Sequence, residues 1–595
     1  MKRLGIFSFT EESGIVDDYV IYLLRDISQN LDEICIISID ELTRESQDKI
    51  RNVAQSDIHF QKDNEFDVYA WRDVMVEYYG FERLMYFDEI ILFNNSFFGP
   101  IYPFEEVFNK MDEENIDFWG ITSHGATPNE KGLCPYEKCP KYIQNYFLAI
   151  RKSMFKSAEF KKYWRNLDSF EDADEVKYKH EVLFTKYFED LGFKWSTYVN
   201  SEDLEDTNEN KNMDLFLYDS YNLVKNRKLP VICIDSFTES REKLMEYNIS
   251  LNSSHIIDYI KANTDYDVSL IYGYLTRVMD PNKLVDNLNL VRIFPKHYSI
   301  DFETDKRVLL IAHLYYEDLL EYDLKYIKNL PDFVDVLITC NTAEKKSFFE
   351  REIAEKLDNC TRVIKVNNRG RDLAALLIGA RDIVKEYDYF CFIHDKKSVA
   401  KEFVTVGATF RDILWENSLA STDYIKFIIK ELEDNPKLGL ILPPRVYHGT
   451  YFNSYVANYW EVNYENTVGL LDELGIKTPI DKDCAPLSIG NCFWAKYDAL
   501  EPLFELYWSH EDFHEEPLPV DGTISHAVER VHGYIAASRG YYSEFVITEE
   551  YARAEMFNFR HMALLTLMTL NEKCSIMNSQ GFLGAKNKID KIIKK

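Results

Sequence analysis

Three carboxylates are crowded into residues 515–521, ahead of a stretch with helical spacing, and Glu516 and Asp521 are two of them. A carboxylate in a fixed position can accept the proton of a sugar hydroxyl that attacks an oxocarbenium-like carbon, as glycosyl transfer with inversion requires. Asp521 is the first candidate for this base, because the glycine after it leaves room for an acceptor. Glu516 is a further candidate, and Glu181 is the candidate in the first half of the chain. For Asp521 and Glu181 the alternative role is that of a helix N-cap.

A second polar group follows the apolar run 363–366 and reads Asn-Asn-Arg-Gly-Arg-Asp. Its candidate ligand-binding members are Asn368, Gly370, Arg371 and Asp372. The planar fork of an arginine can donate two parallel hydrogen bonds to a diphosphate, so this loop is a candidate nucleotide-binding corner. The alternative is a solvated turn in which the aspartate caps the next helix.

A third polar group follows the apolar run 390–393 and consists of His394, Asp395, Lys396 and Lys397. Cations at the end of a buried strand can stabilise a departing diphosphate without a metal ion. Asp395 could instead ligate Mg²⁺ or Mn²⁺. The use of a metal is therefore open, and no residue is assigned as a metal ligand.

Several other functions lack their usual signals in this chain. There is no GxxxxGK[ST] loop, no GxGxxG after a strand, no HExxH and no GxSxG. Cys134, Cys139 and His124 fall short of the four closely spaced ligands of a structural zinc site. The formal net charge of −31 argues against a nucleic-acid partner, because a phosphate backbone requires a basic surface.

The cellular compartment can also be inferred from the sequence. Ten cysteines without a dense framework fit a reducing compartment. The opening MKRLGIFSF is too short an apolar stretch for a signal peptide or an anchor, and it predicts a buried strand. No later run reaches the roughly 20 apolar residues of a spanning helix. We expect a cytoplasmic protein that is soluble or peripheral to the membrane.

The elements that must position these side chains occur twice, roughly 300 residues apart. The matching segments are 3–7 and 307–311, 34–38 and 336–340, 66–71 and 371–376, 86–96 and 386–396, and 144–150 and 489–495. Short apolar runs separated by helix-compatible stretches are typical of parallel strands buried on both faces. In such sheets ligands bind beyond the carboxyl ends of the strands, which is where the polar groups fall. We predict an α/β protein with two tandem Rossmann-like domains and mostly parallel sheets.

Composition gives the expected domain limits. We expect an N-terminal domain at 1–200, an acidic linker and helical spacer at 201–302, a C-terminal domain at 303–550 and a helical, lysine-rich tail at 551–595. The tail carries the apolar run 563–568 and then Lys586, Lys588, Lys591, Lys594 and Lys595. It could contact an anionic bilayer surface. The alternative is a helix packed on its domain with a solvated end.

The whole chain resembles the rhamnan synthesis protein F family of bacterial polysaccharide assembly, over residues 3–200 and 305–550. The strings that carry the resemblance are residues 87–100 (FDEIILFNNSFFGP), 117–122 (DFWGIT), 313–316 (HLYY), 368–372 (NRGRD), 394–398 (HDKKS) and 521–530 (DGTISHAVER). Two strings depart from the family pattern. Asn94-Asn95-Ser96 stands where the family has Asn-Asp-Ser, and residues 490–494 read GNCFW where the family has GTMFW. The first departure removes an acid that a metal in the N-terminal domain would use.

The resemblance implies two GT-A-like glycosyltransferase domains. It also implies dTDP-L-rhamnose as the donor and a lipid-linked saccharide as the acceptor, at the inner face of the cytoplasmic membrane. Placed on this sequence by motif position, the expected donor-binding residues are Asp67, Asn94, Asn95, His313, Asn368, Gly370, Arg371, Asp372, His394, Asp395, Lys396 and Lys397.

Three hypotheses follow for the function. In the first, each domain has its own donor site and adds successive rhamnoses with inversion, using Glu181 and Asp521 as bases. In the second, one domain is active and the other is a degenerate acceptor-binding domain, which the asparagine at Asn95 would mark. In the third, the protein is a non-catalytic scaffold of the polysaccharide assembly machinery.

Overall fold

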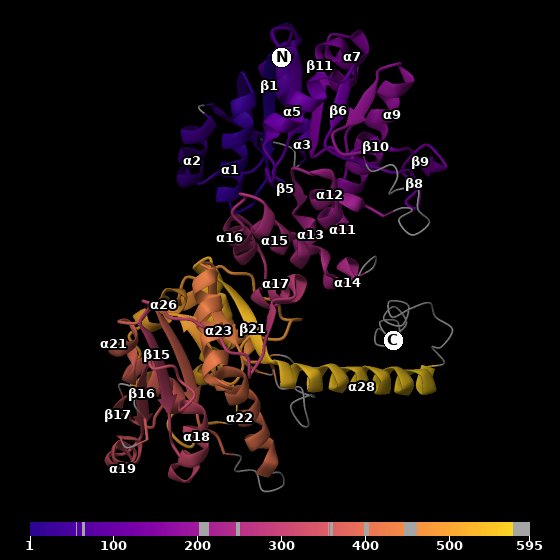
Figure 1. The fold of residues 1–595 in the computed structure, drawn as a ribbon. Coiled ribbons are helices and arrows are strands. Elements are labelled where there is room, and N and C mark those ends of the chain that lie inside the picture. The colour runs from indigo at the N-terminus through magenta and orange to yellow at the C-terminus, as the bar shows by residue number, and fades with distance from the viewer. Residues whose placement is uncertain are drawn as a thin grey trace. The chain divides into compact units, whose positions relative to one another are not determined.

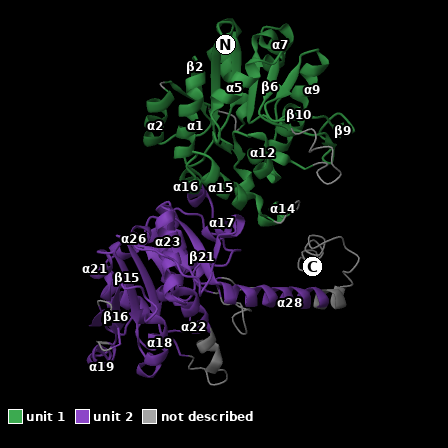
Figure 2. Ribbon diagram, viewed as in Figure 1, with its two compact units in different colours: residues 1–274 green, residues 275–595 purple. Residues whose placement is uncertain are grey.

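In the computed structural model the chain forms two compact units, Met1–Tyr274 and Leu275–Lys595, which Figure 2 shows in different colours. The structure describes residues 1–54, 56–61, 66–200, 213–245, 250–354, 356–357, 361–397, 404–445, 460, 462–519 and 521–574. Each unit contains one large twisted sheet with helices packed against it (Figure 1).

The described part of unit 1 forms a seven-stranded sheet in the order β3-β2-β1-β4-β11-β6-β12. Its strands are β1 (Arg3–Phe9), β2 (Glu33–Ser38), β3 (Ile58–Phe60), β4 (Glu89–Phe93), β6 (Phe118–Gly120), β11 (Phe147–Arg151) and β12 (Trp195–Thr197). All run parallel except β11, which is antiparallel to both of its neighbours. Every residue of β1 is buried, as expected for a strand that is covered on both faces.

Helices and short hairpins connect these strands. The helices are α1 (Asp18–Ile27), α2 (Arg44–Ala54), α3 (Asp67–Asp73), α4 (Gly80–Leu84), α5 (Phe104–Asp112), α6 (Lys152–Phe155), α7 (Ala158–Arg165), α8 (Ala173–Glu175) and α9 (Val182–Asp190), with π-helical segments η2 (Val74–Tyr78) and η3 (Val176–Glu181). The short strands are β5 (Phe97–Phe98), β7 (Ser123–His124), β8 (Thr127–Pro128), β9 (Lys138–Cys139) and β10 (Tyr142–Ile143).

The described part of unit 2 forms an eight-stranded sheet in the order β17-β16-β15-β18-β20-β19-β21-β14. Its strands are β14 (Val291–Phe294), β15 (Val308–His313), β16 (Val334–Cys340), β17 (Thr361–Lys365), β18 (Tyr389–His394), β19 (Leu438–Leu442), β20 (Phe493–Lys496) and β21 (Tyr542–Thr548). The helices are α17 (Pro281–Leu288), α18 (Leu320–Ile327), α19 (Ala343–Ala354), α20 (Arg371–Ala374), α21 (Arg381–Val384), α22 (Val404–Leu419), α23 (Thr422–Asp434), α25 (Tyr464–Glu473), α26 (Tyr497–Glu505), α27 (Ile524–Ser538) and α28 (Glu549–Cys574), with the π-helical segment η5 (Ala375–Gly379).

The predicted α/β fold and its internal repeat are confirmed by the strand order. Counted from β1 and from β15, both sheets place the third, second, first and fourth strands side by side, followed by one antiparallel strand and two further parallel strands. The unit 2 sheet has β14 as one more parallel strand at its outer side. In both units a π-helical segment follows the helix whose first turn holds the matched acid, Asp67 or Asp372. All five segment pairs from the sequence lie on equivalent elements.

A backbone contact that recurs in both units shows which residues of unit 1 correspond to which residues of unit 2. The backbone N–H of Asp88 donates to the carbonyl of Lys2 at 2.7 Å, and that of Asp388 donates to the carbonyl of Arg307 at 3.0 Å. Each aspartate carboxylate accepts the backbone N–H of the same partner at 2.9 Å. The equivalent positions of β1 and β15 are therefore 305 residues apart, one more than the sequence comparison of Arg3 with Arg307 assumed.

The interval 213–300 is divided between the units. In unit 1 it holds α11 (Leu215–Tyr218), α12 (Ser220–Arg227), β13 (Ile232–Cys233), α13 (Asp235–Thr238), α14 (Arg241–Leu244) and α15 (Asn252–Asn263), and α16 (Ser269–Val278) spans the division. β13 pairs with β5, the short strand that follows β4 in the sequence. In unit 2, β14 of the same interval pairs with β21 as the outer strand of the sheet.

Glu89 lies at the amino end of β4 and is fully buried. It accepts hydrogen bonds from Arg3 Nε and Trp119 Nε1, both at 2.8 Å, and Arg151 Nε lies 3.5 Å away. We expect Glu89→Gln to lower the free energy of unfolding of unit 1 by about 3 kcal/mol, because it removes the buried carboxylate that pairs with Arg3 and leaves only the partly exposed Asp112 to offset that guanidinium. Urea denaturation measures this loss. Glu82→Gln, on the surface, is the matched control, and an equal effect of both changes would contradict the prediction.

Candidate functional site

The polar side chains of unit 2 meet at the carboxyl ends of two neighbouring parallel strands. His313 and His394 are the last residues of β15 and β18 and lie opposite each other in the register. Asp372 lies in the first turn of α20, after Gly370, whose φ of +93° suits glycine. A Cβ at Gly370 would lie 2.8 Å from the ring of Phe513, so the turn requires glycine for space as well.

Two side chains of this edge contact Asp372. Asn491 Nδ2 donates to its Oδ2 at 3.0 Å, and His394 Nε2 lies 3.9 Å from the same oxygen. Burial by itself would raise the pKa of the Asp372 carboxyl, but the attraction of His394 and His313 and the Asn491 hydrogen bond hold this pKa below its ordinary value. Burial lowers the pKa of His313 to about 4. The edge therefore holds an ionised carboxylate at neutral pH.

Asp395 follows β18 and faces the loop after β15. Its Oδ2 accepts the backbone N–H groups of Tyr315 at 2.8 Å and Tyr316 at 2.7 Å. Its Oδ1 is buried and has no hydrogen-bond partner among the described residues. Burial raises the pKa of Asp395 to about 6, against the effect of the two backbone donors. One carboxylate oxygen is thus available to a ligand.

The remaining predicted residues of unit 2 have partners from other loops. Arg371 forms a two-bond pair with Glu516, at 2.7 and 2.9 Å, and this pair lowers the pKa of Glu516. Lys397 pairs with Asp318, and Lys396 lies over the Phe410 ring. Asn368 Oδ1 accepts a bond from Asn341 at 3.4 Å. The structure therefore brings a predicted diphosphate ligand and a predicted base, Arg371 and Glu516, into one ion pair.

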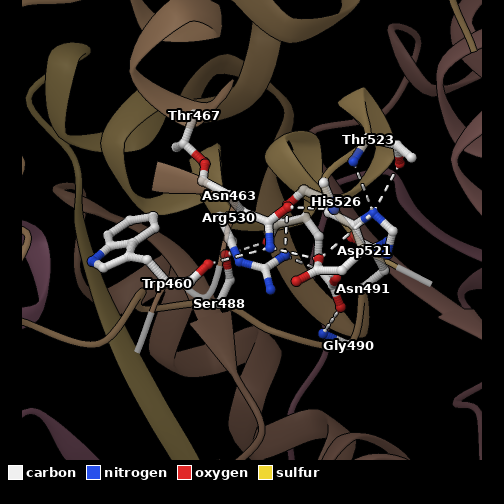
Figure 3. Close-up of polar contacts among 12 residues, drawn as sticks. Trp460, Asn463, Thr467, Ser488, Gly490, Asn491, Asp521, Thr523, His526 and Arg530 are labelled. Carbon is white, nitrogen blue, oxygen red and sulfur yellow. Dashed lines mark hydrogen bonds and ion pairs between the residues drawn. The ribbon is translucent and has the colours of Figure 1, made fainter. Parts of the chain in front are cut away.

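Asp521 lies before α27 and contacts a neighbouring helix (Figure 3). Asn463 Nδ2 donates to its Oδ1 at 2.6 Å, and His526 Nδ1 lies 3.9 Å from the same atom. The N-cap of α27 is Thr523, whose hydroxyl lies 2.8 Å from His526 Nδ1. The N-cap alternative for Asp521 is therefore wrong.

The cap alternative for Asp372 is wrong too, and its counterpart Asp67 is not a helix N-cap either. The N-cap positions of α3 and α20 are Phe66 and Gly370, so the carboxylates of Asp67 and Asp372 lie inside the first turn. Both side chains bind groups at the strand ends instead. This placement favours a role in the site.

Glu529 is a site residue that the sequence analysis did not select. It lies on α27 and accepts the backbone N–H of Gly490, and Arg530 Nη1 is 3.5 Å from its other oxygen. Ser488 Oγ donates to the backbone carbonyl of Glu529 at 2.8 Å. Figure 3 shows the neighbouring Ser488, Gly490 and Arg530. Arg530 is buried, and its Nε has no partner among the described residues.

Unit 1 repeats this arrangement with different chemistry. Ser8 Oγ and Asn94 Nδ2 donate to the two oxygens of Asp67, at 2.5 and 2.8 Å. Ser8, Asp67 and Asn94 thus occupy the places that His313, Asp372 and His394 hold in unit 2. Burial raises the pKa of Asp67, and these two hydrogen bonds only partly offset the effect. Unit 1 therefore has no histidine beside its carboxylate.

Asn95 is the counterpart of Asp395. Its Oδ1 accepts the backbone N–H of Thr10 at 3.1 Å, at the position where Asp395 accepts that of Tyr315. Its Nδ2 donates to the carbonyl of Thr10 at 3.0 Å. Both polar atoms of the Asn95 side chain therefore bind the backbone of a single residue, Thr10.

The structural counterpart of Glu181 is Glu529. Glu181 Oε1 accepts the backbone N–H of Asn145 at 3.0 Å, as Glu529 does that of Gly490. Asn145 and Gly490 are equivalent in the register of β11 against β4 and of β20 against β18. The sequence comparison paired Glu181 with Asp521 because both precede a helix. A comparison of each glutamate's distance from the strand that follows it, β12 in unit 1 and β21 in unit 2, would have identified Glu529.

The described residues contain no group of three or more His, Cys, Asp or Glu side chains that could hold a metal ion. Mg²⁺ is commonly held by one or two carboxylates together with substrate phosphates. Asp395, with its buried Oδ1, fits such a single-carboxylate site.

The comparison with family models gives one match across most of the chain. The model described as "Rhamnan synthesis protein F" matches residues 34–541. Among curated proteins, the uncharacterized protein WxcX of Xanthomonas campestris pv. campestris (strain B100) is 24% identical over 239 residues, which are 39% of this chain and 32% of that protein. The uncharacterized protein y4gN of Sinorhizobium fredii is 20% identical over 203 residues, 34% of this chain and 49% of that protein. The chain thus spans less than half the length of these relatives.

Two solved glycosyltransferases are similar over parts of the chain. The mannosyltransferase PcManGT of Pyrobaculum calidifontis, solved with GDP-Man and Mn²⁺, is 15% identical with a TM-score of 0.24, over 51% of this chain and 68% of its own. The glycosyltransferase GlyE of Streptococcus pneumoniae is 13% identical with a TM-score of 0.24, over 67% and 86%.

Proposed function

Because the chain belongs to the rhamnan synthesis protein F family, we propose that it is a glycosyltransferase that moves L-rhamnose from dTDP-L-rhamnose to a lipid-linked saccharide. The product would be a rhamnose-containing cell-wall or capsular polysaccharide. The observation that carries the proposal is the polar set at the carboxyl edge of unit 2, where Asp372, His394 and Asn491 meet. We further propose that each sheet unit has a GT-A-like fold.

In the proposed reaction an acceptor hydroxyl attacks the anomeric carbon of rhamnose from the face opposite the diphosphate. The bond between that carbon and the diphosphate oxygen breaks, dTDP departs and the configuration inverts. A carboxylate of the enzyme takes the hydroxyl proton. Arg371, Lys396 and Lys397 would offset the charge of the leaving diphosphate.

Asp521 and Glu529 are the two candidates for the proton acceptor in unit 2. Asp521 is the choice from the sequence, and Glu516 is weakened as a candidate by its pair with Arg371. The match between Glu529 and Glu181 favours Glu529 as the proton acceptor. In both units the glutamate accepts the backbone N–H of a residue that lies just before the antiparallel strand, so the two units then have a carboxylate in the same place.

A divalent ion is compatible with this scheme. Mg²⁺ or Mn²⁺ on Asp395 would supply Lewis-acid stabilisation of the diphosphate. Lys345, Lys396 and Lys397 provide positive charge near this edge without it. Adding a chelator to the transferase assay tests whether the proposed reaction needs this ion.

Two forms of the proposal differ in the role of unit 1. In the first, both units transfer rhamnose, with Glu181 as the base of unit 1. An observation on Tyr146 favours the second, in which unit 1 binds the acceptor. Tyr146 is the counterpart of Asn491, and its ring stacks on Phe216 at 4.3 Å instead of reaching the strand-end carboxylate.

The number of donor sites separates the two forms. We expect titration calorimetry of the full chain with dTDP to give one site per chain if unit 1 binds only acceptor, and two if both units are transferases. Asp372→Asn should weaken one of these sites in either case. A chain that neither binds dTDP nor hydrolyses dTDP-L-rhamnose, with or without Mn²⁺, would favour the scaffold hypothesis instead.

A further inference from the structure

A hollow of about 490 Å³ lies at the amino ends of the strands in the unit 2 sheet. Tyr389, the first residue of β18, and Lys496, the last residue of the antiparallel β20, are opposite each other in the register, and both line it. β18 ends at His394, so at about 3.3 Å per residue the hollow is roughly 17 Å from the strand-end cluster of the proposed donor site. Its volume falls within the range of about 300–1,000 Å³ that ligand pockets occupy. The hollow is therefore a second candidate site of unit 2.

Unit 1 has an ion pair at the equivalent place. Glu89 and Arg151 are opposite each other across β4 and β11, as Tyr389 and Lys496 are across β18 and β20. Arg151 donates to backbone carbonyls just beyond α5, and Lys496 donates to backbone carbonyls just beyond α23, so the cation has the same structural role in both units. In unit 1 the cation also lies 3.5 Å from the buried Glu89 carboxylate. Unit 2 has the phenol of Tyr389 in place of that carboxylate, and Lys496 makes no ion pair within the part of the chain that the structure describes.

Two groups at the hollow have unused hydrogen-bonding capacity. An ammonium carries three N–H donors, and Lys496 Nζ donates to the carbonyls of residues 435 and 436, both at 2.9 Å, so one donor is left. Burial lowers the pKa of Lys496 to about 8, and the ammonium form still prevails at neutral pH. The Tyr389 hydroxyl makes no hydrogen bond with another described residue. Burial and neighbouring carboxylates raise the pKa of this hydroxyl to about 12, so it keeps its proton and can donate to a ligand.

The lining of the hollow has nearly balanced charge and several aromatic rings. Three lysines and four carboxylates line it. Because their charges almost cancel, the hollow offers little net attraction to an anionic ligand such as a nucleotide. Its four tyrosines are Tyr387, Tyr389, Tyr497 and Tyr541. A tyrosine combines an apolar ring with a polar tip, and a neutral sugar has the complementary pattern, a face of C–H groups with a rim of hydroxyls. The combination therefore favours a neutral saccharide as the ligand.

We propose that this hollow binds a neutral saccharide segment of the acceptor or growing polysaccharide, away from the end that reacts. The inference deepens the proposed function and rests on it for the identity of the sugar. Tyr497 and Tyr541, both half-buried, supply ring faces, and Tyr497 is held in place by stacking on Phe504 at 5.7 Å. Lys496 and Tyr389 donate to sugar oxygens, and the carboxylates accept from sugar hydroxyls. A long chain then contacts the enzyme at two places and binds more tightly than a short acceptor.

Titration calorimetry of the full chain with a synthetic, lipid-free tetrarhamnoside tests the proposal. We expect saturable binding that the double change Tyr497→Ala and Tyr541→Ala weakens at least about fivefold, because two aromatic contacts are lost. Tyr389→Phe removes one hydroxyl, keeps the buried ring and should weaken binding about fivefold as well. The matched control, Tyr86→Ala with Tyr298→Ala, changes two exposed tyrosines elsewhere and should bind the saccharide like wild type. Every variant should bind dTDP as wild type does.

Acceptor length provides a second readout. The double variant should raise KM for a lipid-linked tetrarhamnoside at least about fivefold and leave KM for a lipid-linked monorhamnoside unchanged. Absence of tetrarhamnoside binding by wild type, or equal binding by wild type and the hollow variants, would overturn the proposal, and so would a loss of dTDP binding in place of saccharide binding. Binding of maltotetraose but not of the tetrarhamnoside, with the same dependence on the tyrosines, would support the saccharide site and contradict the proposed sugar.

Discussion

Replacing Glu529 by glutamine is expected to lower kcat by about 10² to 10⁴-fold, the range that removal of a positioned general base produces. The glutamine can still accept the backbone N–H of Gly490, so the loop before β20 keeps its main contact. KM for the donor should therefore change little. The measurement is the initial rate of acceptor extension by mass spectrometry, across pH.

The pH profile distinguishes a base from a structural residue. Wild type should lose activity on the acid side as its base is protonated, and Glu529→Gln should lose that dependence. Glu529→Asp should restore part of the rate. Asp521→Asn is the matched comparison, with about a tenfold loss expected from the weakened contact with Asn463. A larger loss in Asp521→Asn than in Glu529→Gln would return the role to Asp521.

Asp372→Asn is expected to weaken dTDP binding by at least about tenfold, or about 1.4 kcal/mol. The change removes the negative charge that faces His394 and His313, and it offers Asn491 Nδ2 a poorer acceptor. Calorimetry of the full chain measures the loss. Unchanged binding would show that the strand-end cluster of unit 2 is not part of the donor site.

For Asp372→Asn we also predict how the loss of folding stability depends on pH. The folded-state pKa of Asp372 lies below its ordinary value, so its contribution is present at neutral pH and is lost as pH falls through the folded value. Asp372→Asn should therefore be less stable than wild type at pH 7, by about 1 kcal/mol after allowance for partial exposure, and the difference should vanish in acid. Asp67→Asn is the control, because burial raises the pKa of Asp67 and its ionised form adds no such stabilisation.

The apolar strands were predictable because parallel strands buried on both faces leave a continuous apolar run, as β1 and β15 do. The repeat was predictable for the same reason. The polar groups at the strand ends followed from the rule that loops gather there. This reasoning placed Asp372 and His394 at one edge, where the structure has them, and the family resemblance added His313.

The partners within the site could not be predicted in the same way. Arg371 and Glu516 are 145 residues apart and meet only because the loop before α27 returns to α20. Glu529 was missed because Glu181 was matched with the acid ahead of α27, whereas Glu529 lies inside that helix. The distance to the following strand would have revealed the match, and in the structure the shared backbone N–H contact shows it directly.

The position of β14 has a consequence for dividing the protein into fragments. This strand, Val291–Phe294, closes the outer side of the unit 2 sheet along β21, although it precedes the expected domain start at residue 303. A fragment beginning at 303 would leave unpaired the backbone N–H and C=O groups of β21 that face β14, and an open strand edge recruits other chains. The Asp280 carboxylate, which accepts the Tyr534 hydroxyl at 2.8 Å, would be lost as well. The smallest self-sufficient version of the second unit therefore includes the last part of the connecting segment.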